Sequence, residues 1–145
     1  MPHTQKDLYK KLLGGRGERA ALKYLKKQGL KPVCRNYSTP FGEVDLIMRE
    51  GETLAFIEVK TRTGTEYGTP SQAVDKQKRE RYKRAAAFYL KSNSISQESV
   101  FVRFDVVEVF ALGVPKSVTV GTGEEPPKKE KRGQITVRHV AGAFI

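Results

Sequence analysis

The chain has 145 residues, of which 27 are lysine or arginine and 16 are aspartate or glutamate, so its formal net charge is +11. This length fits a single domain, 1–145, with a sizeable core, and the excess of positive charge predicts a polyanionic partner, with nucleic acid as the first candidate. One cysteine and two histidines exclude an internal disulfide and a zinc cluster, and the lack of a long apolar run or a signal-peptide core predicts a cytoplasmic protein with no membrane partner.

The first residues predict a flexible lead-in, residues 1–15, and then a helix from about Gly17 to Gln28 that Gly29 stops. Three apolar residues follow Glu18 at spacings of three, four and seven: Ala21, Leu22 and Leu25. This spacing puts Glu18 on the apolar stripe of the helix, where its carboxylate would face the sheet. An acid in the first turn can equally serve the helix dipole, and the pattern alone leaves both interpretations open.

Residues 31–40 form a polar stretch, which we expect to be a loop that leads into a hairpin. Arg35 and Tyr37 in this stretch could touch a nucleic-acid backbone or remain solvated. Two apolar runs follow, residues 44–48 and 54–60, and the charged, glycine-containing turn between them predicts a β-hairpin.

Three charged residues interrupt the apolar runs of the hairpin: Asp45, Glu58 and Lys60. Because side chains alternate along a strand, Glu58 and Lys60 share one face. Asp45 joins that face if the hairpin loop has an even number of residues. If Gly51 and Glu52 form the loop, Asp45 lies directly opposite Glu58. If the loop begins one residue earlier, the two acids are diagonal neighbours. A loop with an odd number of residues and no bulge would put them on opposite faces of the hairpin.

Two carboxylates and an ammonium on one face can support metal-assisted hydrolysis of a phosphodiester. Carboxylate oxygens suit Mg²⁺ or Mn²⁺, and Lys60 would orient the nucleophile or contact the scissile phosphate. The alternative interpretation is a structural ion pair, in which Lys60 neutralises one of the acids.

A second helix is predicted from Thr69 as the cap and Pro70 as the first helical residue to about Lys91. Lys78 falls within its apolar stripe, where it either supports the site and contacts phosphate or extends to water. The basic residues expected to contact nucleic acid are Arg35, Arg62, Lys76, Lys78 and Arg79.

Residues 100–110 alternate as a strand in which Arg103 and Asp105 share a face and can pair, so we assign Asp105 no catalytic role. A short edge strand is predicted for 113–120, a disordered loop for 121–133 and a closing strand for 135–140, with Phe144 as an anchor for the end of the chain.

The spacing of Asp45 and the run Glu58-Val59-Lys60 resembles the core motif of the PD-(D/E)xK nuclease superfamily, although Val44 stands where that name has proline. More specifically, residues 42–47 together with 56–62 resemble the bacterial YraN family of small endonuclease-like proteins, which are similar to archaeal Holliday-junction resolvases. The likeness continues through residues 17–21, 73–74 with Lys78, 103–106 and 143–144, and so spans nearly the whole chain.

This resemblance implies an α/β, restriction-endonuclease-like fold with a mixed sheet of about four to five strands flanked by helices. It implies a nuclease that cuts DNA, branched or junction DNA included, with Mg²⁺ (or Mn²⁺) as cofactor. Glu18, Asp45 and Glu58 would be the metal ligands and Lys60 the catalytic lysine. RNA as a substrate and a homodimeric state stay open, and the alternative function is a nucleic-acid-binding protein on a nuclease fold with weak catalysis or none.

Overall fold

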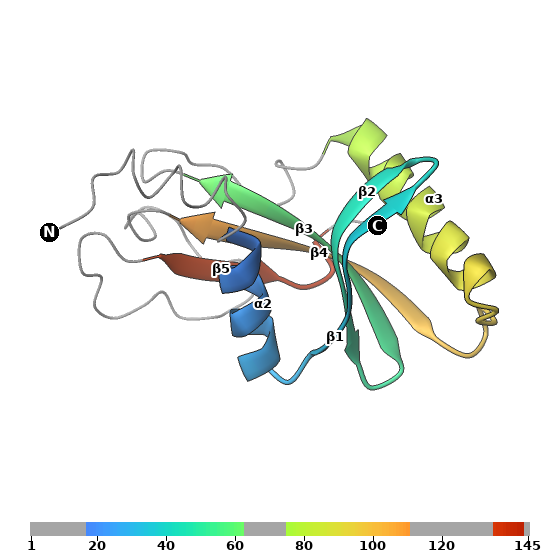
Figure 1. Ribbon diagram of the computed structural model, residues 1–145, viewed down its shortest axis with the longest axis horizontal. Helices are drawn as coiled ribbons and strands as arrows, with labels where there is room; N and C mark the ends of the chain where they lie inside the picture. The colour runs from blue at the N-terminus through green and yellow to red at the C-terminus, as the bar shows by residue number, and fades with distance from the viewer. Residues whose placement is uncertain (1–16, 63–74, 111–134, 144–145) are drawn as a thin grey trace, which may run out of the picture.

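The computed structural model describes residues 17–62, 75–110 and 135–143 (Figure 1). Its elements are α2 (Gly17–Lys27), β1 (Lys31–Thr39), β2 (Gly42–Glu50), β3 (Thr53–Arg62), α3 (Lys76–Ser92), β4 (Phe101–Phe110) and β5 (Thr136–Val140). The five strands form one sheet in the order β1-β2-β3-β4-β5. Only the pairing of β3 with β4 is parallel, so the sheet is mixed.

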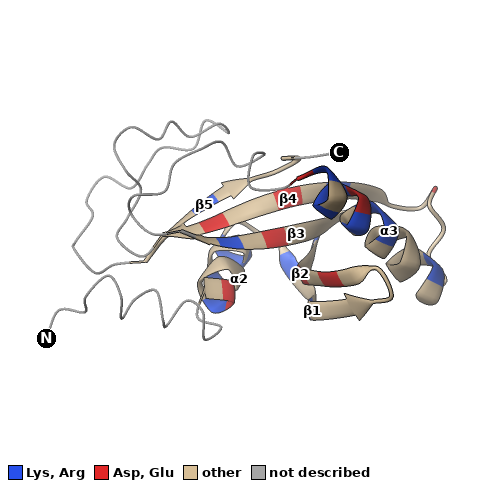
Figure 2. Cartoon of the chain, turned by 90° about the horizontal axis from the view of Figure 1, so that it is seen from above, with Lys and Arg blue, Asp and Glu red and all other residues tan. Residues whose placement is uncertain are grey.

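The side chains of β3 alternate between two apolar layers. Ala55 and Ile57 pack with α2 on one face, whereas Leu54 and Phe56 pack with α3 on the other. Burial of each large apolar side chain contributes about 1.5–3 kcal/mol, so both layers hold the sheet. The result is the α/β, restriction-endonuclease-like architecture that the sequence predicts, with helices on both faces of a five-stranded sheet (Figure 2).

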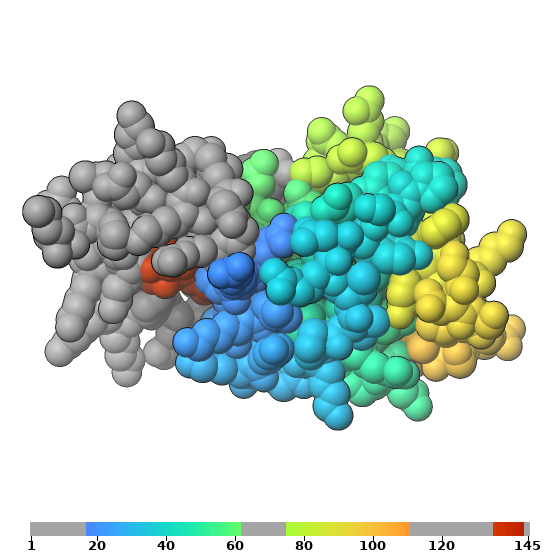
Figure 3. Space-filling model, viewed as in Figure 1, coloured from blue at the N-terminus to red at the C-terminus, as the bar shows by residue number. Residues whose placement is uncertain are grey.

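Helix α2 confirms the first helix prediction to within a residue. Ala21 and Leu25 are fully buried, as their spacing predicts. Gly29 ends the helix with a φ of +98°, a value that residues with a side chain rarely adopt. The space-filling view shows α2, in blue, next to the cyan surface of β1 and β2 (Figure 3).

The loop expected at residues 31–40 is wrong, because Lys31–Thr39 is strand β1 and pairs antiparallel with β2. Most of its side chains are exposed, and only Cys34 and Tyr37 pack, as partly buried residues, against the apolar layer beneath α3. An edge strand with one or two inward side chains has no apolar alternation to reveal it.

The hairpin prediction is confirmed in its first register. Leu46 pairs with Ile57 and Glu50 with Thr53, so the loop is Gly51–Glu52. Asp45 and Glu58 are the next positions along this register, just beyond its last pair.

The predicted start of the second helix is wrong. Asp75 has an extended backbone, and its Oδ1 accepts the N–H of Lys78 at 2.8 Å, so Asp75 is the N-cap and α3 begins at Lys76. Residues 69–74 lie outside the described residues. The end of α3 at Ser92 agrees with the predicted end near Lys91.

Strands β4 and β5 confirm the predictions for 100–110 and 135–140. The lead-in 1–15, the edge strand 113–120, the loop 121–133 and Phe144 fall outside the described residues. Neither of the two described helices is long and apolar enough to cross a membrane.

Candidate active site

The hairpin of β2 and β3 opens at Asp45. Regular pairing of these strands ends at Leu46 and Ile57, after which β2 continues beside β1 and β3 continues beside β4 (Figure 1). At this point Oδ2 of Asp45 accepts the backbone N–H of Val59 at 2.8 Å. A carboxylate therefore takes the place of a strand carbonyl, and the bond fixes the orientation of Asp45.

Tyr82 of α3 reaches into the opening. Its hydroxyl donates to Oε2 of Glu58 at 2.6 Å, lies 3.3 Å from the carbonyl of Ile57 and accepts the N–H of Asp45 at 3.5 Å. Burial raises the pKa of Tyr82 above its ordinary value, as do the charges of Glu58 and Asp45. The hydroxyl stays protonated and bridges the two strands where their own pairing has ended.

Lys78 lies one helical turn before Tyr82 and contacts the same carboxylate. Its Nζ is 2.6 Å from Oε1 of Glu58, so both oxygens of this glutamate have a donor on α3. The side chain of Glu58 is only 10% exposed, and a carboxylate this buried requires such partners. Of the alternatives for Lys78, support of the site matches this geometry.

Asp45 and Glu58 repel each other, and Glu18 adds to the repulsion. Burial is the largest cause that raises the pKa of Asp45, to about 7; the negative charge of Glu58 comes next, and that of Glu18 contributes less. The bond from Val59 acts in the opposite direction. Glu18 is half-buried on α2, and its charge acts on Asp45. Three predicted acids from three elements therefore share one region.

A divalent cation fits the chemistry of these donors, because it would relieve the repulsion that raises the pKa of Asp45. The arrangement of these side chains is incomplete as a metal site, however. Within residues 17–62, 75–110 and 135–143, no three Asp, Glu, His or Cys side chains are grouped closely enough to hold a metal ion. Asp45 and Glu58 form the close pair, and Glu18 stands farther away.

Lys60 shares the face of Glu58 but does not pair with it. Among the described residues its ammonium forms no ion pair, and Lys78 is the cation on Glu58. The neighbour of Lys60 on β4 is Glu108, which is buried with Arg138 and bonded to its Nε at 2.9 Å. Within the described residues, Lys60 therefore forms no structural pair with a site carboxylate.

The residues expected to contact nucleic acid are only partly brought together. Lys76, Lys78 and Arg79 lie in the first turn of α3, where Figure 2 shows basic residues in blue, whereas Arg35 is an exposed residue of β1. Arg62 ends β3, and its side chain is outside the description.

Tyr82 was not predicted as a site residue, and its contact with Glu58 was missed. The signal was its spacing of four residues from Lys78, which puts both side chains on one face of α3. The pairing of Arg103 with Asp105 is confirmed, with Nε 2.9 Å from Oδ1. Asp105 also contacts His139 and the N–H of Gly142, so it fastens β4 to β5 and the turn that follows.

Residues 17–109 match the model of the uncharacterised protein family UPF0102, a range that contains every site residue described above. A UPF0102 protein of Desulfosudis oleivorans is 48% identical over 96 residues, which cover 66% of this chain and 76% of the relative. A UPF0102 protein of Rhodococcus opacus is 38% identical over 132 residues, covering 91% and 95% of the two chains.

Proposed function

This chain belongs to the uncharacterised protein family UPF0102, the YraN family, and on that premise we propose that it is a divalent-metal-dependent nuclease that hydrolyses phosphodiester bonds in DNA, branched DNA included. The observation that carries the proposal is the carboxyl group of Asp45. It is held by Val59 beside Glu58, and its pKa is raised to about 7 by burial and by its two acidic neighbours. Repulsion of this kind within a fold is typical of a site that receives a cation.

Asp45 and Glu58 would hold Mg²⁺ or Mn²⁺, and Glu18 would be the third protein ligand. Bound there, the cation supplies a Lewis acid for the phosphate and lowers the pKa of a coordinated water. Lys78 already occupies Oε1 of Glu58, so it would have to give up this contact to let Glu58 coordinate.

The remaining side chains have separable roles in this proposal. Lys60 lies two positions after Glu58 on the same face and would hold the scissile phosphate by its ammonium. Tyr82 keeps one oxygen of Glu58 oriented, and the N–H of Val59 does the same for Asp45. Lys78, once released from Glu58, is free to contact a neighbouring phosphate.

The second candidate function is a nucleic-acid-binding protein whose cleavage is weak or absent. A specific observation favours it: Lys78 already neutralises Glu58, and the three acids are not grouped as ready ligands in the described part of the chain. A buried carboxylate that is so well paired can also be purely structural.

Cleavage of a panel of labelled single-stranded, duplex, flapped and four-way DNA, and of matched RNA, tests the first candidate. We expect products with Mg²⁺ or Mn²⁺, none in chelator, and none from Asp45→Asn or Glu58→Gln. Tight binding by the wild type without metal-dependent products would favour the second candidate, and products that persist in both variants would show that Asp45 and Glu58 do not carry the cleavage.

A further inference from the structure

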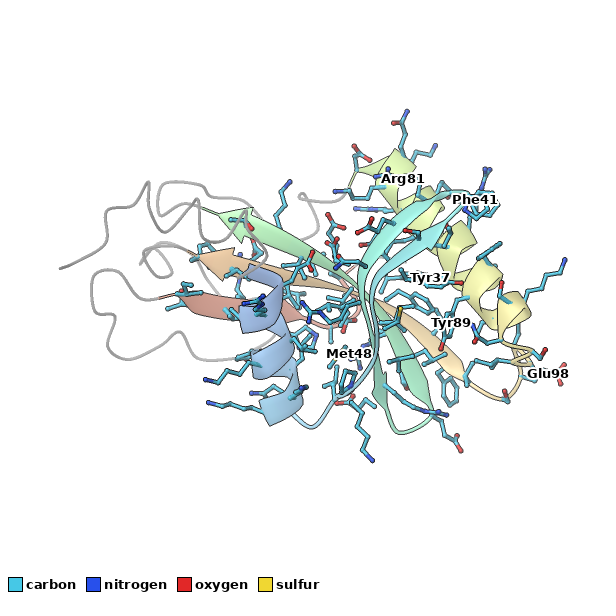
Figure 4. All side chains as sticks on the ribbon, viewed as in Figure 1. Tyr37, Phe41, Met48, Arg81, Tyr89 and Glu98 are labelled. Carbon is cyan, nitrogen blue, oxygen red and sulfur yellow. The ribbon has the colours of Figure 1, made fainter. Side chains whose placement is uncertain are left out.

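A basic pocket lies where the turn between β1 and β2 meets the first turns of α3. Its volume is about 410 Å³, and its lining residues are Phe41, Lys76, Gln77, Glu80, Arg81 and Arg84. The three cations face one acid, and Glu80 lies 3.8 Å from Lys83. Figure 4 shows Phe41 and Arg81 close together at this end of the molecule. The pocket therefore suits an anionic ligand.

The ring of Phe41 is held at the surface of this pocket. It is 39% exposed, although it is a large apolar side chain. Thr39 fixes the turn, because its Oγ1 accepts the N–H of Phe41 at 3.0 Å and donates to the carbonyl of Gly42 at 2.8 Å. Phe88 of α3 supports the ring edge-on, with centroids 6.4 Å apart. A rigid, accessible aromatic ring is what an unstacked base packs on.

Two arginines lie beside this ring without an acidic partner in the described residues. The guanidinium of Arg84 is 5.9 Å from the centroid of Phe41, and the side chain of Arg81 runs along Gly42. Gly42 has a φ of +127°, and a β-carbon there would come within 3.5 Å of Cδ of Arg81. The turn thus packs against one arginine at Gly42 and gives the other an aromatic neighbour. Guanidinium groups of this kind bind phosphate through paired N–H donors.

The pocket lies within reach of the carboxylates. Lys78 and Tyr82 contact Glu58, while Arg81 and Arg84 line the pocket from an adjacent face of the same helix. An α-helix with its side chains is about 10–12 Å across. A single strand that crosses the first turns of α3 can therefore occupy both places, a few nucleotides apart.

We propose that this pocket binds one unpaired nucleotide, with its base stacked on Phe41 and its phosphate held by Arg81 and Arg84. The inference rests on the proposed function in taking nucleic acid as the ligand, and it specifies the substrate class: DNA with a single-stranded branch or end. Continuous duplex offers no base to Phe41, because its bases remain stacked on one another.

Binding of labelled flapped DNA and of a duplex of equal length, measured by fluorescence anisotropy in chelator, tests this inference. We expect the wild type to prefer the flap. Phe41→Leu keeps an apolar residue against Phe88 but loses the stacking surface, so flap binding should weaken about tenfold while duplex binding changes little. Lys91→Gln is the charge control for Arg84→Gln, because both remove one cation from α3. Only Arg84→Gln should reduce the preference for the flap.

A 2-aminopurine base in the unpaired segment gives a second readout, since stacking on Phe41 should quench its fluorescence in wild type but not in Phe41→Leu. Equal binding of flap and duplex by the wild type, or an unchanged preference in Phe41→Leu with a wild-type melting curve, would overturn the inference. Because chelator removes cleavage from the assay, flap preference without cleavage in Mg²⁺ would refute only the nuclease, and cleavage without flap preference would refute only this pocket.

Discussion

The hydroxyl of Tyr82 lies 2.6 Å from Oε2 of Glu58 and also accepts the N–H of Asp45, so one side chain of α3 joins the two strands that carry the acids. Removal of this oxygen takes away the donor to Oε2 of Glu58 and the acceptor of the Asp45 N–H. The strands themselves cannot compensate, because their pairing has already ended at Leu46 and Ile57.

Tyr82→Phe should therefore destabilise the protein by about 1–3 kcal/mol and slow cleavage, because Glu58 loses a fixed donor. Urea unfolding gives the first quantity, and single-turnover cleavage gives the second. Tyr89→Phe is the matched control: its ring packs edge-on against Phe56 and Tyr37, and its hydroxyl has no hydrogen bond among the described residues. Equal losses in both variants would reduce Tyr82 to a packing residue.

Lys60→Ala should lower cleavage about 10²–10³-fold, as expected for the loss of one preorganised donor to a developing charge. Its melting temperature without metal should equal that of the wild type, because Lys60 has no ionic partner in the described structure. Its Mn²⁺ affinity, measured by calorimetric titration, should be retained or improved, because a nearby positive charge repels the metal.

Lys78→Met provides the contrast, because Lys78 is the ammonium bound to Glu58. This variant should melt below the wild type in chelator and recover with Mn²⁺, which then neutralises Glu58 without competition. Full cleavage by Lys60→Ala, or a lower melting temperature for Lys60→Ala than for Lys78→Met, would contradict these assignments.

Asp45→Asn should abolish cleavage and leave metal-free stability equal or higher at neutral pH. The folded-state pKa of Asp45 is raised from 3.8 to about 7, so the folded state retains a proton that the unfolded chain releases. The stabilisation that the protonated Asp45 gives to the folded state is complete at pH values below the pKa of Asp45 in the unfolded chain. It is lost as the pH rises through the folded-state pKa of about 7. Melting curves between pH 4 and pH 8 in chelator should show Asp45→Asn gaining on the wild type across this range. A constant difference would mean that Asp45 titrates normally.

Asp105→Asn should show the opposite dependence on pH. Burial alone would raise the pKa of Asp105, but the contacts with His139, Arg103 and the N–H of Gly142 outweigh it and hold the pKa below its ordinary value. The stabilisation that the ionised Asp105 gives to the folded state is present at pH values above the pKa of Asp105 in the unfolded chain. It is lost as the pH falls through the pKa of Asp105 in the folded state. At pH 7 we expect a loss of about 3 kcal/mol in urea unfolding, and the loss should shrink in acid. A loss independent of pH would show that the charge of Asp105 is unimportant.

DNA binding should weaken about tenfold or more between 50 and 200 mM salt, because each phosphate contact releases counterions. Sequence preference should be weak, since no recognition helix or zinc finger is evident in the sequence. Anisotropy titrations on two duplexes of different sequence at several salt concentrations measure both properties. Salt-independent binding, or strong discrimination between the duplexes, would rule out recognition through the backbone.

The sequence predicted the hairpin, because a charged, glycine-containing turn joins two apolar runs, but it left the register open between two loops, and the pairing of Glu50 with Thr53 selects the Gly51–Glu52 loop. Strand β1 was missed because an exposed edge has little apolar pattern. The cap at Asp75 was missed because Thr69 and Pro70 carry a complete start signal six residues earlier. The side chains that contact Glu58 could not be identified from the sequence. Lys78 and Tyr82 belong to a distant part of the chain, and their contact with Glu58 depends on how α3 crosses the sheet.

Among the described strands, β1 lies at one border of the sheet with no strand on its outer side, and such borders invite pairing with another molecule and aggregation. Several features of β1 oppose this: Pro32 has no N–H to offer, the register shifts between Pro32 and Cys34, and Asn36 has a φ of +51°. Exposed Lys31 and Arg35 would also repel the same residues of a second copy. The border is thus poorly suited to edge-to-edge extension of the sheet.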